Sequence, residues 1–263
     1  MYAIEYQRAK SVADAAAALA RTGGKALAGG QSLVGAMKLR LANPGTVVDL
    51  SGITELKGIK KDGDALTIGA LATHAEVAAS SVVRQAIPAL AALAEGIGDR
   101  QVRNRGTIGG SIANNDPAAD YPAAVLALNA TVQTNKRKIA ADDFFKGMYE
   151  TALAADEIIV AVSFPVPKKA AYVKFPNPAS RFALVGVFVA QTAAGVRVAV
   201  TGAAPHVHRA GAIEAALAKA FTADAAKVVK ISPDQLNSDM HGSAEYRAHL
   251  VSVLAARAVA AAA

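Results

Sequence analysis

The run from residue 106 to residue 123 reads G-T-I-G-G-S-I-A-N-N-D-P-A-A-D-Y-P-A and gathers hydroxyl, amide and carboxylate side chains around two adjacent glycines. Gly109 and Gly110 lack a Cβ, so the chain can adopt positive φ and a ligand can approach the backbone closely. Successive backbone N–H groups in such a segment form a concave site for phosphate. The run therefore predicts an anion-binding loop that offers bare N–H groups.

A second glycine stretch, Ala28-Gly29-Gly30-Gln31-Ser32-Leu33, occurs earlier in the chain. A short apolar strand precedes it and a helix follows it, and a helix N-terminus after a glycine turn is a geometry that binds phosphate. An ordinary strand-to-helix turn capped by Ser32 stays open as the alternative. The stretch is not the G-x-G-x-x-G fingerprint of a Rossmann fold. We expect the two glycine loops to close on one dinucleotide.

Two carboxylates follow the second loop, one helical turn apart. Asp120 lies near the start of an expected helix, where a negative charge favours the helix dipole. Acidic side chains in dinucleotide sites also accept hydrogen bonds from ribose hydroxyls. From the residues alone, capping and ribose binding remain equally open for Asp116 and Asp120.

Composition sets the class of protein. The chain has 263 residues, 53% of them hydrophobic and 19% charged, which fits a soluble globular protein of two domains. The formal net charge is +7, but Lys and Arg are scattered and lack interleaved aromatic residues, so we expect no nucleic-acid partner. Without an apolar leader or a run long enough to cross a bilayer, we expect no membrane insertion and a cytoplasmic location.

The sequence contains no cysteine, which excludes disulfides and any iron–sulfur cluster that cysteines of this chain would hold. The histidines lack the spacing of a metal site, and no G-x-S-x-G motif is present. We therefore predict neither a metal site nor a catalytic acid–base residue. The five histidines are His74, His206, His208, His241 and His249.

Periodicity and capping signals predict a mixed helix and strand pattern. The expected helices span about residues 11–22, 32–41, 73–79, 82–96 with a kink or break at Pro88, 121–128, 209–220, 223–229 and 244 onward. The expected strands span about 25–28, 46–50, 131–134, 138–140, 157–164, 171–175, 183–191 and 195–201, with a hairpin turn at 61–64. The proline pair Pro165 and Pro167 is the best domain boundary.

Four motifs in order along the chain resemble one family: A-G-G-Q-S-L at 28–33, M-K-L-R at 37–40, Q-V-R-N-R-G-T-I-G-G-S-I-A-N-N-D-P-A-A-D-Y-P-A at 101–123, and S-A-E-Y-R-A-H-L with A-A-R-A at 243–258. This is the FAD-binding medium subunit of molybdenum hydroxylases of the aerobic carbon monoxide dehydrogenase and xanthine dehydrogenase type. The resemblance implies an α+β fold with a two-subdomain FAD-binding domain of the vanillyl-alcohol-oxidase-like (PCMH) type at 1–167, its subdomains at about 1–55 and 56–167. A small C-terminal domain of antiparallel sheet plus helices would follow at 168–263.

The resemblance also implies which residues contact FAD. Residues of the two loops would hold the pyrophosphate and adenosine part, with Asp120 nearby, and Phe182 falls where relatives place a residue, in some of them a tyrosine, against the isoalloxazine ring. Phenylalanine can pack on that ring but cannot donate a hydrogen bond to it; a core aromatic is the alternative. The assigned residues are Lys25, Ala26, Leu27, Ala28, Gly29, Gly30, Gln31, Ser32, Leu33, Thr107, Ile108, Gly109, Gly110, Ser111, Asn114, Asp116, Asp120, Ile158, Ile159, Lys174 and Phe182.

By the same resemblance, the chain would pass electrons through FAD to an external acceptor. A large subunit would carry molybdopterin and a small subunit two [2Fe–2S] clusters, in a dimer of heterotrimers. The absence of cysteine in this chain agrees with clusters that lie on a partner. A stand-alone FAD-dependent oxidase or reductase and a non-catalytic scaffold remain the alternatives. The substrate and the acceptor are not encoded in these residues.

Overall fold

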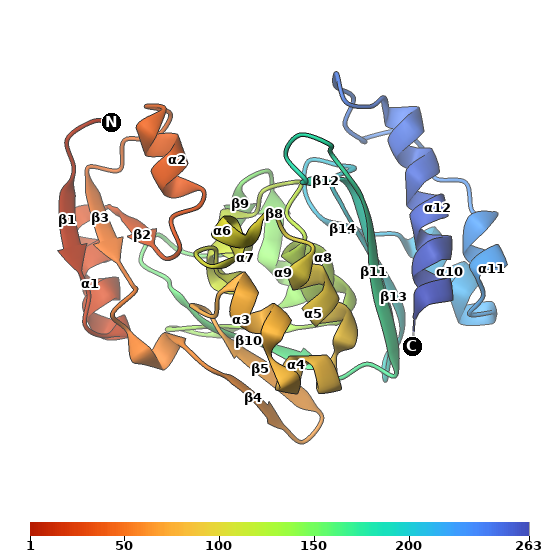
Figure 1. The fold of residues 1–263 in the computed structure, drawn as a ribbon, viewed down its shortest axis with the longest axis horizontal. Coiled ribbons are helices and arrows are strands. Elements are labelled where there is room, and N and C mark those ends of the chain that lie inside the picture. Colours follow the sequence, from red (N-terminus) through yellow and green to blue (C-terminus); the bar gives the residue numbers. More distant parts are fainter. Residues whose placement is uncertain (263) are drawn as a thin grey trace.

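Three larger sheets follow one another along the chain, with a two-stranded sheet beside the second, and helices lie between them (Figure 1). The computed structural model describes residues 1–262. The α+β class expected from the sequence is confirmed: a small parallel sheet comes first, and two antiparallel sheets follow.

The first unit is the parallel sheet β1-β3-β2, made of β1 (Glu5–Arg8), β2 (Lys25–Leu27) and β3 (Thr46–Asp49). Helix α1 (Val12–Thr22) begins where the Ser11 hydroxyl accepts from the Asp14 amide, and it ends at Gly23 with φ 63°. Helix α2 (Leu33–Lys38) joins β2 to β3, so the expected β-α-β unit is confirmed. Helix α2 is shorter than expected because Arg40 adopts φ 60°.

The second unit is an antiparallel sheet in the order β4-β5-β10-β6-β7, reached through a 3₁₀ turn, η1 (Thr54–Leu56). The strand predicted at 157–164 is its central member. The strands are β4 (Ile59–Asp62), β5 (Ala65–Gly69), β6 (Thr131–Thr134), β7 (Lys138–Ala140) and β10 (Ile159–Pro165). Both expected hairpins, β4–β5 and β6–β7, are confirmed.

Six helices lie between β5 and β6 in the chain: α3 (His74–Ala79), α4 (Ser81–Ala86), α5 (Pro88–Glu95), α6 (Arg100–Arg103), α7 (Ile108–Asn114) and α8 (Tyr121–Ala127). All of them except α6 contribute buried residues to the core of this unit. The helix expected at 82–96 breaks at Ile87, because Pro88 can start a helix at its first position but cannot continue one. A short helix α9 (Ala141–Phe144) and the hairpin of β8 (Phe145–Gly147) and β9 (Glu150–Thr151) complete the unit.

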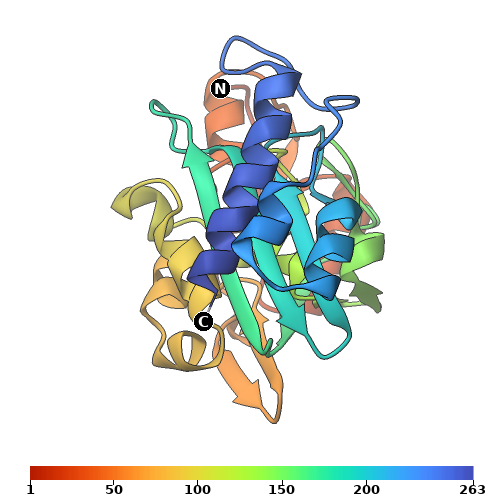
Figure 2. The same cartoon turned by 90° about the vertical axis from the view of Figure 1, so that its right-hand side faces the viewer.

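The third unit is the antiparallel sheet β11-β12-β13-β14, made of β11 (Lys169–Pro176), β12 (Ala183–Thr192), β13 (Gly195–Thr201) and β14 (His208–Arg209). One face packs against α5 and α8 of the second unit, and helices α10 (Gly211–Lys219), α11 (Ala223–Lys227) and α12 (Ala244–Ala261) cover the other. Figure 2 shows α12 lying across these strands. Because both faces are covered, β12 is buried along nearly its whole length.

Candidate functional site

The two glycine loops lie against each other although they are far apart in the sequence. A Cβ on Gly29 would stand 1.9 Å from the carbonyl oxygen of Arg105 and 2.9 Å from the Cα of Gly106. On the other side, a Cβ on Gly110 would lie 3.7 Å from the Cβ of Ala28. Only glycine fits at position 29, and the close approach joins strand β2 of the first unit to the loop before α7.

The first loop offers unpaired backbone donors. Strand β2 ends at Leu27 and α2 begins at Leu33, and between them Gly30 adopts φ 78°. Within residues 1–262, the amides of Gly29, Gly30, Gln31 and Ser32 donate to no protein acceptor. Ser32 does not cap α2 through its side chain, so its exposed hydroxyl is also available. A run of free N–H groups before a helix matches the chemistry of an anion such as pyrophosphate.

The second loop differs from the expectation. The Gly109 amide donates to the Ala70 carbonyl at 2.9 Å, and the Gly110 amide donates to the Thr107 hydroxyl at 3.1 Å. The Ser111 amide donates to the Thr107 carbonyl at 2.9 Å. The prediction that this run presents bare amides is therefore wrong at these three positions. Thr107 caps helix α7, and the helix uses the donors itself.

Close packing against Ala70 requires a glycine at position 109. A Cβ there would lie 2.6 Å from the Cβ of Ala70, at the end of strand β5. The glycines thus bring α7 close to the sheet and bring the first loop close to α7. The half-buried Ser111 side chain remains as a polar group on this wall.

Asp120 is a buried carboxylate that receives two donors from strand β11. The Tyr172 hydroxyl donates to Oδ1 at 2.6 Å, and the Lys174 ammonium lies 3.0 Å from Oδ1 and 3.2 Å from Oδ2. Lys174 also donates to the Gly96 carbonyl at 2.9 Å. Burial raises the pKa of Asp120, and the nearby Lys174 charge and the hydrogen bonds from Tyr172 and Lys174 oppose that rise. The side chain does not cap α8, so the capping interpretation is wrong.

A pocket of about 280 Å³ places Asp120 beside Phe182. One wall comes from Ile97 to Val102 around α6, and the other comes from residues 179–182, the loop between β11 and β12. The Phe182 side chain is 48% exposed, so it is not the core aromatic of the alternative interpretation. Asp120 and Phe182, which the sequence alone could not connect, thus line one cavity at the junction of the second and third units, and Lys174 contacts Asp120 there from β11.

Asn115 and Asp116 hold the β8–β9 hairpin. The Asn115 amide side chain donates to the carbonyls of Gly147 and Glu150, each at 2.8 Å. Asp116 accepts from the Ala118 amide at 2.9 Å and from the Tyr149 hydroxyl at 3.1 Å. Both side chains therefore already have structural roles, and the half-buried Asn114 ends helix α7 beside them.

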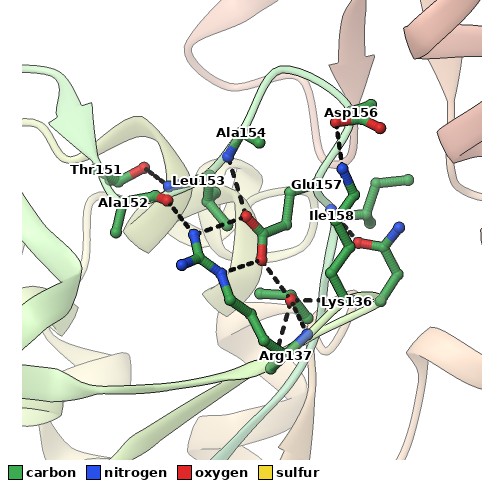
Figure 3. A network of polar contacts seen from close by, with 11 residues as sticks. Lys136, Arg137, Thr151, Ala152, Leu153, Ala154, Asp156, Glu157 and Ile158 are labelled. Carbon is green, nitrogen blue, oxygen red and sulfur yellow. Dashed lines mark hydrogen bonds and ion pairs between the residues drawn. The ribbon is translucent and has the colours of Figure 1, made fainter.

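Ile158 and Ile159 are buried at the start of β10, 4% and 5% exposed. Ile158 belongs to the network in Figure 3. Its amide donates to the Asn135 side chain at 2.8 Å, and its carbonyl accepts from the Asn135 amide at 3.0 Å. Next to them, Glu157 accepts from Arg137, from the Thr134 hydroxyl and from a backbone amide. The hydrogen bond from Arg137 is the main cause that lowers the pKa of Glu157 to about 2.

Tyr172 of the third sheet was missed from the sequence, although Lys174 on the same strand was assigned. Tyr172 and Lys174 alternate along β11, so the strand period places both side chains on one face, and that spacing was the available signal. Among residues 1–262, no group of three His, Asp or Glu side chains could hold a metal ion, and no helix is long and apolar enough to cross a membrane.

Two family models match the chain. One is described as the FAD binding domain in molybdopterin dehydrogenase and matches residues 2–167. The other is the CO dehydrogenase flavoprotein C-terminal domain and matches residues 170–262.

Similar proteins share nearly the whole length. The nicotine 6-hydroxylase medium subunit of Paenarthrobacter nicotinovorans is 38% identical over 98% of this chain and 96% of its own length. The carbon monoxide dehydrogenase medium chain of Hydrogenophaga pseudoflava is 36% identical over the same two shares. The solved structure of carbon monoxide dehydrogenase from Hydrogenophaga pseudoflava that lacks the Mo-pyranopterin moiety superposes with a TM-score of 0.90 at 37% identity, covering 99% of this chain and 97% of that chain.

Proposed function

Because this chain belongs to the family of FAD-binding medium subunits of molybdenum hydroxylases, we propose that its glycine loops and the Asp120 pocket together hold FAD. The chain is the flavoprotein component of a multi-subunit oxidoreductase. FAD, when bound, supplies the redox chemistry that takes electrons from iron–sulfur clusters of a partner subunit and passes them to an external acceptor. The residues of this chain bind and orient the cofactor.

The observation that carries the binding proposal is the run of free amides in the first loop. A pyrophosphate group needs several converging donors, and the loop from Gly29 to Ser32 has donors without protein acceptors. The second loop acts differently: α7 uses its own amides, and Gly109 and Gly110 instead shape the wall against which the first loop lies. Ser111 is the side chain of that wall that can reach the cofactor.

Asp120 and Phe182 would contact the cofactor from the pocket side. The carboxylate has accepting capacity left beyond the bonds from Tyr172 and Lys174, so it can receive a hydroxyl or N–H donor of FAD. Phe182 offers an exposed aromatic face for ring packing. The pocket of about 280 Å³ holds only a portion of a dinucleotide, which agrees with a binding site spread over both loops and the pocket.

The remaining assignments also stay proposals. Lys25 to Ala28 lead into the first loop, and Thr107 and Ile108 into the second. Ile158 and Ile159 can reach a ligand only through their backbone as the chain stands, because their side chains are buried. We assign the FAD-binding domain to 1–167, with subdomains at about 1–55 and 56–167, and the C-terminal domain to 168–263, supported by the succession of the three sheets.

For the assembly, we propose a large molybdopterin subunit, a small subunit with two [2Fe–2S] clusters, and a dimer of these heterotrimers. The absence of cysteine supports this, since clusters that cysteines hold must then lie on another chain. The cytoplasmic location stays a prediction from the sequence. The substrate is bound on the large subunit in this arrangement and is not read from this chain.

The test is FAD retention in the complex purified through a tag on this chain. Gly110→Asp places a carboxylate where the two loops meet, so we expect the variant to lose FAD by visible absorption while its partners still co-purify. Gly35→Asp is the matched control, because a Cβ at Gly35 meets nothing within 4 Å. FAD retained by the Gly110→Asp complex would count against the loop assignment. A flavoprotein that purifies without partners would instead favour a stand-alone enzyme.

A further inference from the structure

The third sheet holds the backbone segment before Asp120 through hydrogen bonds. The Thr201 hydroxyl lies 2.9 Å from the Pro117 carbonyl and 2.7 Å from the Ala119 carbonyl, and the Gly202 amide donates to the Pro117 carbonyl at 2.8 Å. The backbone before Asp120 is thus fixed by the end of β13. The direction of the Asp120 side chain is then set by the donors on β11.

Two contacts fix the Tyr172 side chain so that its hydroxyl donates to Asp120. Its ring stacks on Phe188 of the neighbouring strand, with centroids 6.0 Å apart and an interplanar angle of 29°. Its hydroxyl donates to Oδ1 of Asp120 at 2.6 Å, which is the range of a hydrogen bond to a charged acceptor. Because stacking on Phe188 fixes the ring and the hydrogen bond to Asp120 fixes the hydroxyl, the Tyr172 side chain is held in one position.

Gly186 makes that position possible. It lies inside strand β12, where glycine weakens a strand because it has no side chain to pack. A Cβ at Gly186 would stand 2.2 Å from the Tyr172 hydroxyl oxygen and 2.9 Å from the Thr201 methyl group. Gly186 does not have positive φ, so space and not backbone conformation requires glycine here.

Lys174 and Tyr172 have different tasks. Lys174 supplies the positive charge that a buried carboxylate needs, and it is anchored by the Gly96 carbonyl. Because its ammonium lies 3.0 Å from Oδ1 and 3.2 Å from Oδ2, Lys174 does not favour one oxygen over the other and sets the rotation of the carboxylate about its bond to Cβ only loosely. The short bond from the rigid Tyr172 to Oδ1 fixes that rotation, so that the remaining accepting sites have a defined direction at the pocket shared with Phe182.

We infer that Tyr172, with the space left by Gly186, is a positioning residue that orients the Asp120 carboxylate toward the cofactor across the junction of the second and third sheets. This inference rests on the proposed FAD site. It gives Tyr172 a task in cofactor binding without direct contact, because Tyr172 sets the direction of the carboxylate that the second unit presents to FAD.

The experiment measures FAD dissociation constants and the visible circular dichroism of bound flavin in the purified complex. Tyr172→Phe keeps the ring and removes the hydroxyl, and we expect FAD to bind about tenfold more weakly, the effect of losing one hydrogen bond to a charged group. A changed flavin dichroism is expected as well, because a turned carboxylate alters the environment of the cofactor. Tyr6→Phe is the matched control, since the Tyr6 hydroxyl also donates to an aspartate, Asp49, in the first unit.

Gly186→Ala should weaken FAD binding by pushing the Tyr172 hydroxyl away. Because both substitutions act on the same contact, the Gly186→Ala/Tyr172→Phe double variant should bind FAD more tightly than the product of the two single effects predicts. Equal affinity and dichroism in the Tyr172→Phe and wild-type complexes would overturn the inference and leave the proposed function intact. A wild-type complex that binds no FAD even after reconstitution would overturn both.

Discussion

Replacing Gly29 with alanine tests whether the two glycine loops form one site. The added methyl group would lie 1.9 Å from the Arg105 carbonyl oxygen, whereas ordinary contacts begin at 3.4 Å, so the loops must separate by about 1.5 Å. The acceptor is backbone and cannot swing aside as a flexible side chain would. The displacement therefore moves the free amides of residues 29–32 relative to the wall formed by Ser111.

The cost has two parts. Overpacking of this kind destabilises a fold by about 1–3 kcal/mol. A constellation of donors must be held within about 0.5 Å of its working geometry, and a 1 Å misplacement can cost about a hundredfold, so we expect the FAD dissociation constant to rise by about a hundredfold. The assay is titration of the FAD-depleted complex with FAD, followed by quenching of flavin fluorescence, beside urea unfolding of the same preparation.

Gly35→Ala provides the control, because it adds the same methyl group a few residues further along the chain, into open space on α2. Alanine inside a helix is favoured over glycine by about 0.5–1 kcal/mol, so this variant should be slightly more stable and should keep its FAD. A Gly29→Ala complex that binds FAD as tightly as the Gly35→Ala complex would refute the two-loop site.

Three further predictions concern acid stability and the flavin ring. Burial, and then the Arg103 charge, lower the pKa of His74 from 6.5 to about 4, so the unfolded chain takes up a proton at a higher pH than the folded chain. The wild-type protein should therefore lose up to about 3 kcal/mol of unfolding free energy as pH falls from 6.5 to 4. The His74→Gln variant should not show this loss. Glu157→Gln should cost about 2 kcal/mol at neutral pH by breaking the Arg137 pair. This difference should shrink as pH falls from 4.5 to 2, because the unfolded wild-type chain then takes up a proton on Glu157 that the folded chain does not; an equal difference at all pH values in urea titrations would contradict the assigned role. Phe182→Tyr should leave unfolding unchanged, because the side chain is half exposed, but should shift the visible absorption of bound flavin; an identical spectrum would argue against contact with the ring.

Much of the fold follows from local signals in the sequence. Caps and glycine stops located α1, alternation located β13, and Pro88 located a break between α4 and α5. Helix α7 was missed because two adjacent glycines have low helix propensity. There the Thr107 cap and the close packing of Gly109 on Ala70 outweigh the propensity, and neither contact is visible from neighbours in the sequence.

The candidate site, like the fold, could be predicted from the sequence only in part. The pairing of residues 28–33 with 106–111 was predictable, because both stretches combine adjacent glycines with hydroxyl side chains. The fate of their amides was not predictable, since the acceptors of the second loop include carbonyls of Ala70 and Ala72 from another part of the chain. The link from Asp120 to β11 also depends on the packing of two units, which composition and periodicity do not encode.

Each of the three units contributes a different group of residues to the proposed FAD site. The free amides belong to the first unit, the wall and Asp120 to the second, and the donors that orient Asp120 to the third. Each contribution is correct only when the units are packed as they are here, because Gly29 contacts Arg105 and Tyr172 contacts Asp120 across unit boundaries. At the proposed site, FAD would therefore bind more tightly to the packed arrangement than to any loosened one, and by linkage FAD would stabilise that arrangement. A partner subunit that holds the units together would raise FAD affinity even without touching the cofactor, since it would supply part of the ordering that binding otherwise requires.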